Sequence, residues 1–266
     1  MTRQGVLYQI IGNFFYLCSR NKQTIMADKA YFTYKVEPQS LDFTSRLKSP
    51  ALIMSALNAA GADAHNKGFD YVDMEQDDHT WVLSRMAIEV DFRPKQYSDY
   101  EIETWISGYN RLLSTRNFRI YDEEGKQFAK MTSQWAMLNV NTRSAVDLTR
   151  TADVHDKYMV QEEPPCAAPC RLRGVAEGEE FRHTVRYSDI DFNRHMNTIR
   201  YIEMIFDHLP VEAIAEDRPF RLDMHFLHEA VLGEVLTIST KEEEGVRLFE
   251  ISTAENPCVR AALAWL

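Results

Sequence analysis

Four residues in the second half of the sequence have side chains suited to acyl-transfer chemistry. Asp191, Asn193 and His195 alternate within the stretch DIDFNRHMN, and Glu229 follows in HFLHEA. Alternation would place the first three side chains on one side of an extended segment. A carboxamide can stabilise a developing oxyanion, and an imidazole can move protons near neutral pH. We therefore treat these four residues as candidate catalytic residues.

Each candidate also has a purely structural interpretation. Asp and Asn are good helix-capping residues, so Asp191 and Asn193 could simply cap the helix that follows, with His195 on the surface. Glu229 stands among apolar neighbours and is either a general base, an orienter of His195 or a solvated strand end. The residues alone leave these alternatives open.

The elements that must position these residues recur in the same order in both halves. In the first half, a helix is predicted from an N-cap at Ser49, with Pro50 at its first position and Gly68 as a left-handed end. Its apolar residues recur at helical spacing with few charges on any face, which predicts a mostly buried helix. Strands are predicted at 31–36, 80–92, 99–107, 112–121 and 126–140. One buried helix with a long antiparallel meander is an α+β layer in which the sheet wraps the helix.

The second half restarts this pattern after a stretch that contains prolines and glycines. Strands are predicted at 181–187, 219–229, 234–241, 246–253 and 258–266, with a helix at about 197–209. The segment LDFTSRL matches IDFNRHM 149 residues later, which supports an internal duplication. Thr44 then stands in the place of Asn193, and Arg46 in the place of His195. Only the second half therefore carries the candidate chemistry at this junction.

These boundaries divide the chain into four parts. They are an N-terminal extension (1–27), an N-terminal domain (28–150), a linker (151–178) and a C-terminal domain (179–266). The apolar run at 6–18 resembles a short signal-peptide core, but it is too short to span a bilayer and no A-x-A pattern follows. We expect the extension to lie outside the fold, with secretion as the alternative.

Composition excludes several classes of function. The net charge of −10 argues against nonspecific binding to nucleic acid or to an anionic membrane. Four cysteines form no disulfide framework in a chain of this size, which favours a cytoplasmic protein. No Gly-rich phosphate loop, metal-ligand cluster or nucleophile elbow occurs, so we expect neither a metal nor another cofactor.

Several stretches resemble the acyl-acyl carrier protein thioesterases of plant plastids and bacteria. They are TWVLSRMAIEV, YEIETWISGYNRLLSTRNFRIYD, TSQWAMLNVNTRS and DIDFNRHMNTIRYIEMI. The resemblance extends over roughly residues 28–160 and 178–266. The D-x-N-x-H-x-N pattern is the most specific part, because it stands at the predicted strand–helix junction of the second half.

The resemblance implies two tandem hotdog domains, each an antiparallel sheet wrapped around a long buried helix, and hydrolysis of fatty acyl thioesters on acyl carrier protein. Asp191, Asn193, His195 and Glu229 match the family's catalytic positions. Many members have a cysteine after the glutamate, whereas this chain has Ala230. That difference leaves attack by water, with Asp191 either holding the loop or acting as a nucleophile through an anhydride.

The acyl chain is expected in the first half, because the helix there is apolar. Candidate lining residues, each equally well a core residue, are Leu52, Ile53, Ala56, Leu57, Trp81, Met86 and Trp135. Acyl carrier protein is acidic, so its binding requires a local basic patch. The candidates are Arg111, Arg116, Arg119 and Arg194, with Lys126, Lys130 and Arg143 as further positions, and solvated strand faces are the alternative interpretation.

Two other functions remain possible. One is a hotdog thioesterase that acts on coenzyme A esters, and the other is a noncatalytic hotdog protein that binds acyl groups. Two hotdog halves in one chain can satisfy the pairing that single-domain members achieve by dimerising, which allows a monomer. A homodimer through exposed sheet edges is equally allowed, so the sequence leaves the oligomeric state open.

Overall fold

The computed structural model describes residues 29–70, 74, 78–151 and 156–266, and the predicted extension at 1–27 lies outside the described residues. The N-terminal half contains β1 (Ala30–Lys35), the 3₁₀ turn η1 (Pro38–Ser40), α2 (Ser49–Lys67), β2 (His79–Val90), β3 (Asp99–Tyr109), β4 (Ser114–Asp122), β5 (Gln127–Asn139) and η2 (Leu148–Thr151). The C-terminal half contains β6 (Glu179–Thr184), η3 (Tyr187–Asp189), α5 (Thr198–Asp207), α6 (Val211–Ala215), β7 (Phe220–Phe226), β8 (Val235–Glu243), β9 (Val246–Ser252) and β10 (Pro257–Trp265).

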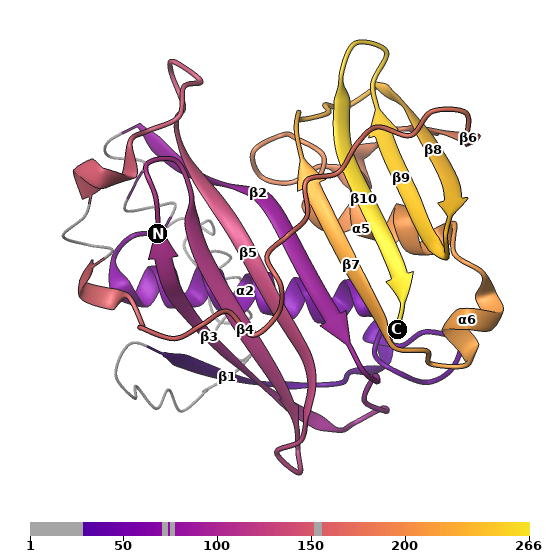
Figure 1. Cartoon of the computed structure of the whole chain (residues 1–266), viewed down its shortest axis with the longest axis horizontal. Helices are drawn as coiled ribbons and strands as arrows, with labels where there is room; N and C mark the ends of the chain where they lie inside the picture. The colour runs from indigo at the N-terminus through magenta and orange to yellow at the C-terminus, as the bar shows by residue number, and fades with distance from the viewer. Residues whose placement is uncertain (1–28, 71–73, 75–77, 152–155) are drawn as a thin grey trace, which may run out of the picture.

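The described strands form one ten-stranded antiparallel sheet that runs through both halves. Its order is β1-β3-β4-β5-β2-β7-β10-β9-β8-β6. Strand β2 pairs with β7, in a register from Arg85↔His225 to Val90↔Phe220, and this pair joins the halves. Both helices lie against the same face of the sheet, α2 behind the strands of the N-terminal half and α5 behind those of the C-terminal half (Figure 1). The predicted α+β hotdog arrangement, a sheet wrapped around a helix in each half, is confirmed.

The internal duplication is visible in the backbone. Adding 149 to the bounds of β1 gives those of β6, and the same shift carries η1 onto η3 and the first residue of α2 onto that of α5. The strand order of the first half, β1-β3-β4-β5-β2, corresponds to β6-β8-β9-β10-β7 in the second. The two halves therefore face each other through equivalent strands, as two subunits of a symmetric dimer would.

The two central helices differ in length and in their ends. Helix α2 has 19 residues, begins at Ser49 and ends at Gly68, which adopts the predicted left-handed conformation (φ 76°). The predicted N-cap was wrong by one residue, because Lys48 is the N-cap and Ser49 already belongs to the helix. Helix α5 has only 10 residues, and the short α6 follows it; periodicity did not predict this helix, since five residues are too few to show a pattern.

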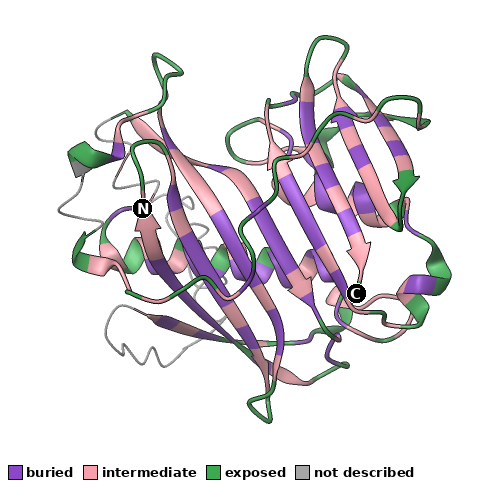
Figure 2. Cartoon of the chain, viewed as in Figure 1, coloured by how far each residue is buried: buried purple, intermediate pink, exposed green. Residues whose placement is uncertain are grey.

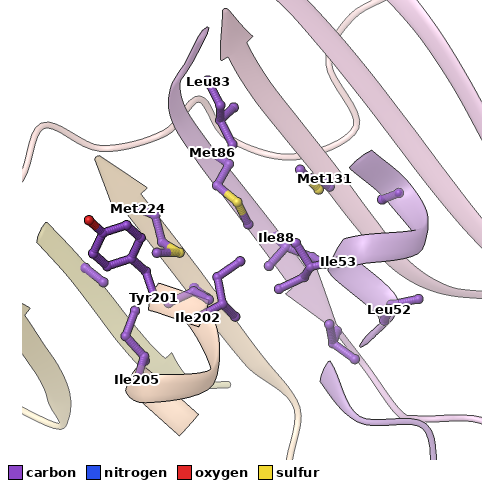
Figure 3. Close-up of a cluster of buried hydrophobic side chains, with 14 of the residues drawn as sticks. Leu52, Ile53, Leu83, Met86, Ile88, Met131, Tyr201, Ile202, Ile205 and Met224 are labelled. Carbon is purple, nitrogen blue, oxygen red and sulfur yellow. The ribbon is translucent and has the colours of Figure 1, made fainter. Parts of the chain in front are cut away.

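One hydrophobic core extends across both halves. Side chains of α2 and β2, such as Ile53 and Met86, lie near Ile202 of α5 and Met224 of β7 (Figure 3). Buried positions run along the strands, and exposed ones gather in the connecting loops (Figure 2). Among the described residues, no helix is both long enough and apolar enough to cross a membrane.

Candidate active site

The loop that carries Asp191, Asn193 and His195 is a tight turn between η3 and α5. Ile190 and Met196 form an antiparallel bridge, and Asp191 N–H donates to the His195 carbonyl (2.9 Å). The predicted extended segment was wrong. Arg194 adopts a left-handed conformation (φ 65°), which reverses the chain. The turn places Phe192, Asn193 and Arg194 at an exposed tip.

Asp191 holds this turn together. Its Oδ1 accepts hydrogen bonds from Asn193 N–H (2.8 Å) and His195 N–H (3.3 Å). The helix α5 is capped instead by Asn197, whose side chain accepts from Ile199 N–H (2.8 Å). Asp191 and Asn193 are therefore not the caps of the helix. The carboxylate of Asp191 fixes the backbone on which Asn193 and His195 stand.

His195 and Glu229 lie together although 34 residues separate them in the sequence. His195 Nδ1 is 3.3 Å from Glu229 Oε1. Two backbone interactions bring His195 and Glu229 together. His195 forms a β-bridge with Val231, and Met196 N–H donates to the Ala230 carbonyl (2.8 Å). Both side chains are partly accessible to solvent, at 27% for His195 and 34% for Glu229. Glu229 thus faces the imidazole from a half-exposed position rather than from an apolar pocket.

A second anchor lies directly before the turn. Asp189 is buried, and its carboxylate accepts from Arg186 N–H (2.8 Å) and Arg200 Nε (2.9 Å) and contacts His183 Nε2 (2.7 Å). Burial alone would raise the pKa of the carboxyl, but these hydrogen bonds outweigh it and hold the pKa of Asp189 below its ordinary value. Asp189 thereby ties the turn to the first turn of α5.

An apolar cavity of about 310 Å³ opens in the N-terminal half beside this turn. It lies between the C-terminal part of α2 and strands β2 to β5, and Leu57, Trp81 and Trp135 line it. Phe192, which stands between Asp191 and Asn193, also lines this cavity although it belongs to the other half. The turn that carries the candidate catalytic residues therefore meets the cavity of the opposite half.

The seven residues predicted to line the acyl site fall into two groups. Leu57, Trp81 and Trp135 line the cavity. The other four are buried core residues that are not among its walls, namely Leu52, Ile53, Ala56 and Met86. Helix α2 thus contributes its C-terminal part to the cavity and its N-terminal part to the core.

The four arginines expected to bind the carrier occupy different environments. Arg111 and Arg194 are exposed. Arg119 is half-buried and forms ion pairs with Glu103 (3.4 Å) and Glu162. Arg116 is buried, its Nη1 is 2.7 Å from Asp63 Oδ2, and it lines the cavity. Arg116 is therefore buried, and its side chain does not lie on a surface that a carrier protein could contact.

The equivalent turn in the N-terminal half has lost these functional groups. Asp42 again accepts from the backbone two residues on (Thr44 N–H, 2.8 Å), and Ser45 repeats the left-handed conformation (φ 60°). Arg46 forms a β-bridge with Lys95, as His195 does with Val231. Arg93 stands two residues before Lys95, as Glu229 stands two residues before Val231, so the two positions are equivalent. Arg93 is buried and pairs with Asp42 and with Asp217 (2.7 Å). This second turn has no imidazole and no free carboxylate to offer a substrate.

The cavity beside this second turn is also different. A pocket of about 350 Å³ is lined by Phe43 and Phe206, the counterparts of Phe192 and Leu57. Its walls include Ile214 of α6 and charged side chains such as Arg93 and Arg200. The long α2 leaves an apolar cavity, whereas the shorter α5 is followed by α6, which occupies this end of the C-terminal half.

Two side chains that the structure places at the candidate site did not stand out in the sequence. Phe192 was read only as part of the motif, although an aromatic residue between two candidate polar residues was a usable signal. Arg143 was expected only as one of several basic positions, but its Nη2 contacts Glu229 Oε2. No sequence signal connects Arg143 with Glu229, because they lie 86 positions apart.

Comparisons with known proteins match both halves of the chain to one family. The model of the acyl-ACP thioesterase N-terminal domain matches residues 28–158, and that of the C-terminal domain matches residues 173–264. A crystal structure of an acyl-ACP thioesterase from Bacteroides thetaiotaomicron superimposes with a TM-score of 0.83 at 32% identity, covering 90% of this chain and 98% of that one. The 12:0-ACP thioesterase from Umbellularia californica shares the fold, with a TM-score of 0.81 at 18% identity over 91% of this chain and 99% of that one.

Curated relatives include oleoyl-acyl carrier protein thioesterase 2, chloroplastic, from Arabidopsis thaliana, which is 32% identical over 61% of this chain and 47% of its own length. The chain spans about half the length of the curated relatives it matches. The resemblance found in the sequence motifs is confirmed by the family models and by the solved structures. The chain belongs to the acyl-ACP thioesterase family.

Proposed function

We propose that this protein hydrolyses fatty acyl thioesters carried by acyl carrier protein. One observation carries the proposal: Phe192, placed between Asp191 and Asn193, lines the apolar cavity of the opposite half. An acyl chain in that cavity would bring its thioester carbonyl to the exposed tip of the turn. In this proposal, the N-terminal domain (28–150) holds the acyl chain, the C-terminal domain (179–266) supplies the catalytic residues, and residues 151–178 link them.

The proposed reaction is attack by water on the thioester carbonyl. The Asn193 amide donates to the carbonyl oxygen as negative charge develops there. Glu229 orients His195, whose imidazole accepts a proton from the attacking water. A new C–O bond forms, the C–S bond breaks, and the departing carrier thiolate takes up the proton to leave a free fatty acid.

Asp191 has a supporting role in this scheme. Its Oδ1 already accepts two backbone hydrogen bonds, which favours holding the turn over acting as a nucleophile. A single turnover in ¹⁸O-labelled water tests this assignment. Label that enters only the fatty acid supports direct attack by water, whereas label in the Asp191 carboxylate would indicate an anhydride.

The carrier would dock beside the turn through the exposed arginines Arg111 and Arg194. Arg119 is a weaker candidate, because Glu103 and Glu162 already pair with it. Charge-assisted hydrogen bonds to the phosphopantetheine phosphate suit a guanidinium group. If this surface steers an acidic carrier, the rate on the carrier should fall steeply with salt, since exposed charges are screened. We further propose a cytoplasmic reaction, with the chain as a monomer or homodimer.

The test is product analysis with the purified protein and a ladder of acyl groups on acyl carrier protein and on coenzyme A. We expect release of free fatty acid, with a higher kcat/KM on acyl carrier protein. A higher kcat/KM on coenzyme A would favour an acyl-CoA thioesterase. Acyl binding without product on either carrier would favour a noncatalytic acyl-binding protein.

A further inference from the structure

A side chain from the N-terminal half reaches the candidate catalytic pair of the C-terminal half. The Nη2 atom of Arg143 contacts Glu229 Oε2, while Glu229 Oε1 lies 3.3 Å from His195 Nδ1. The two carboxylate oxygens of Glu229 are thus divided between a cation and the imidazole. A residue of the opposite half therefore contacts the same carboxylate that faces His195.

The loop that carries Arg143 is held in shape by its own hydrogen bonds. Asn139 Oδ1 accepts from Asn141 N–H (3.1 Å) and Thr142 N–H (2.9 Å), and Arg143 N–H donates to the Asn139 carbonyl (2.9 Å). Arg143 itself is left-handed (φ 56°), which is uncommon for a residue with a side chain. The loop holds this conformation at the residue that contacts Glu229.

The contact contributes little to folding. Arg143 is 64% exposed, and an exposed ion pair is worth only about 0–1 kcal/mol because water screens it and two side chains lose freedom. A gain in stability does not account for a constrained loop that ends in an exposed arginine. Its geometry instead restricts the carboxylate that faces His195, and preorganisation of that kind acts on reaction rate.

We propose that Arg143 is a positioning residue that fixes the Glu229 carboxylate against His195, so that the N-terminal half contributes to the chemistry as well as to acyl binding. This inference rests on the proposed thioester hydrolysis. Arg143 touches neither the acyl group nor the water in this scheme and acts only through Glu229.

The principal alternative is that Arg143 is a docking cation for the acidic carrier. The two roles differ in substrate dependence. A positioning residue affects every thioester equally, whereas a docking cation matters only when the carrier protein is present. Hydrolysis should therefore be measured on acyl carrier protein and on the same acyl group joined to N-acetylcysteamine, a small thiol without protein or phosphate.

The variants are Arg143→Ala, Arg143→Lys, Glu229→Gln and the double variant, with Arg150→Ala as a control. Arg150 is an exposed arginine in the same half, near the end of η2. We expect Arg143→Ala to lower kcat about tenfold on both substrates with KM nearly unchanged, a part of the 10²–10⁴-fold that general acid–base catalysis contributes. Arg143→Lys should restore part of the loss, because the ammonium keeps the charge without the planar fork.

Two comparisons make the result decisive. In the Glu229→Gln background, Arg143→Ala should cost less than about twofold, because the group it positions is already gone. A loss confined to KM, or to the carrier-borne substrate, would overturn the positioning role in favour of docking. A wild-type protein that hydrolyses neither substrate would instead overturn the proposed function itself, whereas an active wild type with an equally active Arg143→Ala variant overturns only the role of Arg143.

Discussion

Glu229 and Arg93 occupy equivalent positions in the two halves of the molecule. Glu229 stands two residues before Val231, which forms a β-bridge with His195. Arg93 stands two residues before Lys95, which forms a β-bridge with Arg46. Glu229 faces an imidazole, whereas Arg93 is buried between Asp42 and Asp217. The same backbone arrangement thus carries the candidate catalytic pair in one half. In the other half it carries an ion-pair clamp that joins the segment after β2, the first turn and the segment after α6.

The Arg93 clamp should be important for stability and unimportant for chemistry. Arg93→Met removes the buried cation of Asp42 and leaves Asp217 only its longer contact with Arg46 (3.4 Å), and breaking a buried ion pair costs about 3–5 kcal/mol. Urea unfolding should show this loss in the free energy of unfolding. Adding Asp42→Asn and Asp217→Asn should recover part of it, and an unchanged midpoint in the single variant would show that the clamp contributes nothing.

Phe192 should influence the acyl group, and its counterpart Phe43 should not. Phe192→Ala removes apolar surface at the mouth of the cavity, and contacts of that size are worth about 1–3 kcal/mol in discrimination between substrates. We therefore expect kcat/KM to fall by about 5–100-fold and the chain-length profile to change. Phe43→Ala, which alters the equivalent exposed ring in the other turn (64% exposed, against 75% for Phe192), is the matched control. Equal effects of the two substitutions would argue against a single composite site.

Substitutions at Trp135 and Leu52 test which residues of α2 and its sheet line the cavity and which belong to the hydrophobic core. Trp135 lines the cavity, whereas Leu52 is fully buried in the core. Trp135→Ala should shift the preferred acyl length toward longer or bulkier chains. Leu52→Ala should lower the free energy of unfolding by about 2–5 kcal/mol and leave the chain-length profile unchanged. A profile altered by Leu52→Ala alone would place the acyl chain deeper than the described cavity.

Asp189 should make the protein sensitive to acid. Its folded-state pKa lies below the ordinary value of 3.8, because hydrogen bonds outweigh the effect of burial. A lowered pKa means that its contribution to stability is present above 3.8 and is lost as the pH falls through the folded-state pKa. Asp189→Asn should therefore cost about 1.5–3 kcal/mol at neutral pH. That difference should shrink in unfolding experiments below pH 3.8, and a pH-independent difference would contradict the role of its charge.

Much of the fold could be predicted because local patterns determine it. The strands and the buried α2 follow from short-range periodicity, and Gly68 marks the end of α2 by its residue type. The repeat at 149 residues follows from the match between LDFTSRL and IDFNRHM. The shape of the candidate turn did not follow, because Arg194 adopts a left-handed conformation that is common only for Gly and, less often, for Asn or Asp. Alternation in the sequence therefore gave the wrong geometry for Asp191, Asn193 and His195.

The composition of the site depended on contacts that no local pattern contains. Pairing of β2 with β7 decides that Phe192 meets the cavity of the opposite half and that Arg143 reaches Glu229. The distinction between Leu57 in the cavity and Leu52 in the core likewise depends on which part of α2 the sheet covers. Arg116 was misjudged for the same reason, since its partner Asp63 lies 53 residues earlier.

The most direct measurement is the turnover of acyl carrier protein thioester by Asn193→Ala and His195→Ala beside Thr44→Ala, the matched change in the first turn. We expect each of the first two variants to lose roughly 10²-fold or more in kcat, the usual scale for an oxyanion donor or a proton-transfer group. Thr44→Ala should remain within about twofold of the wild type, because its turn carries no catalytic group. Near-native turnover by both Asn193→Ala and His195→Ala would contradict a single catalytic turn acting on the cavity of the opposite half.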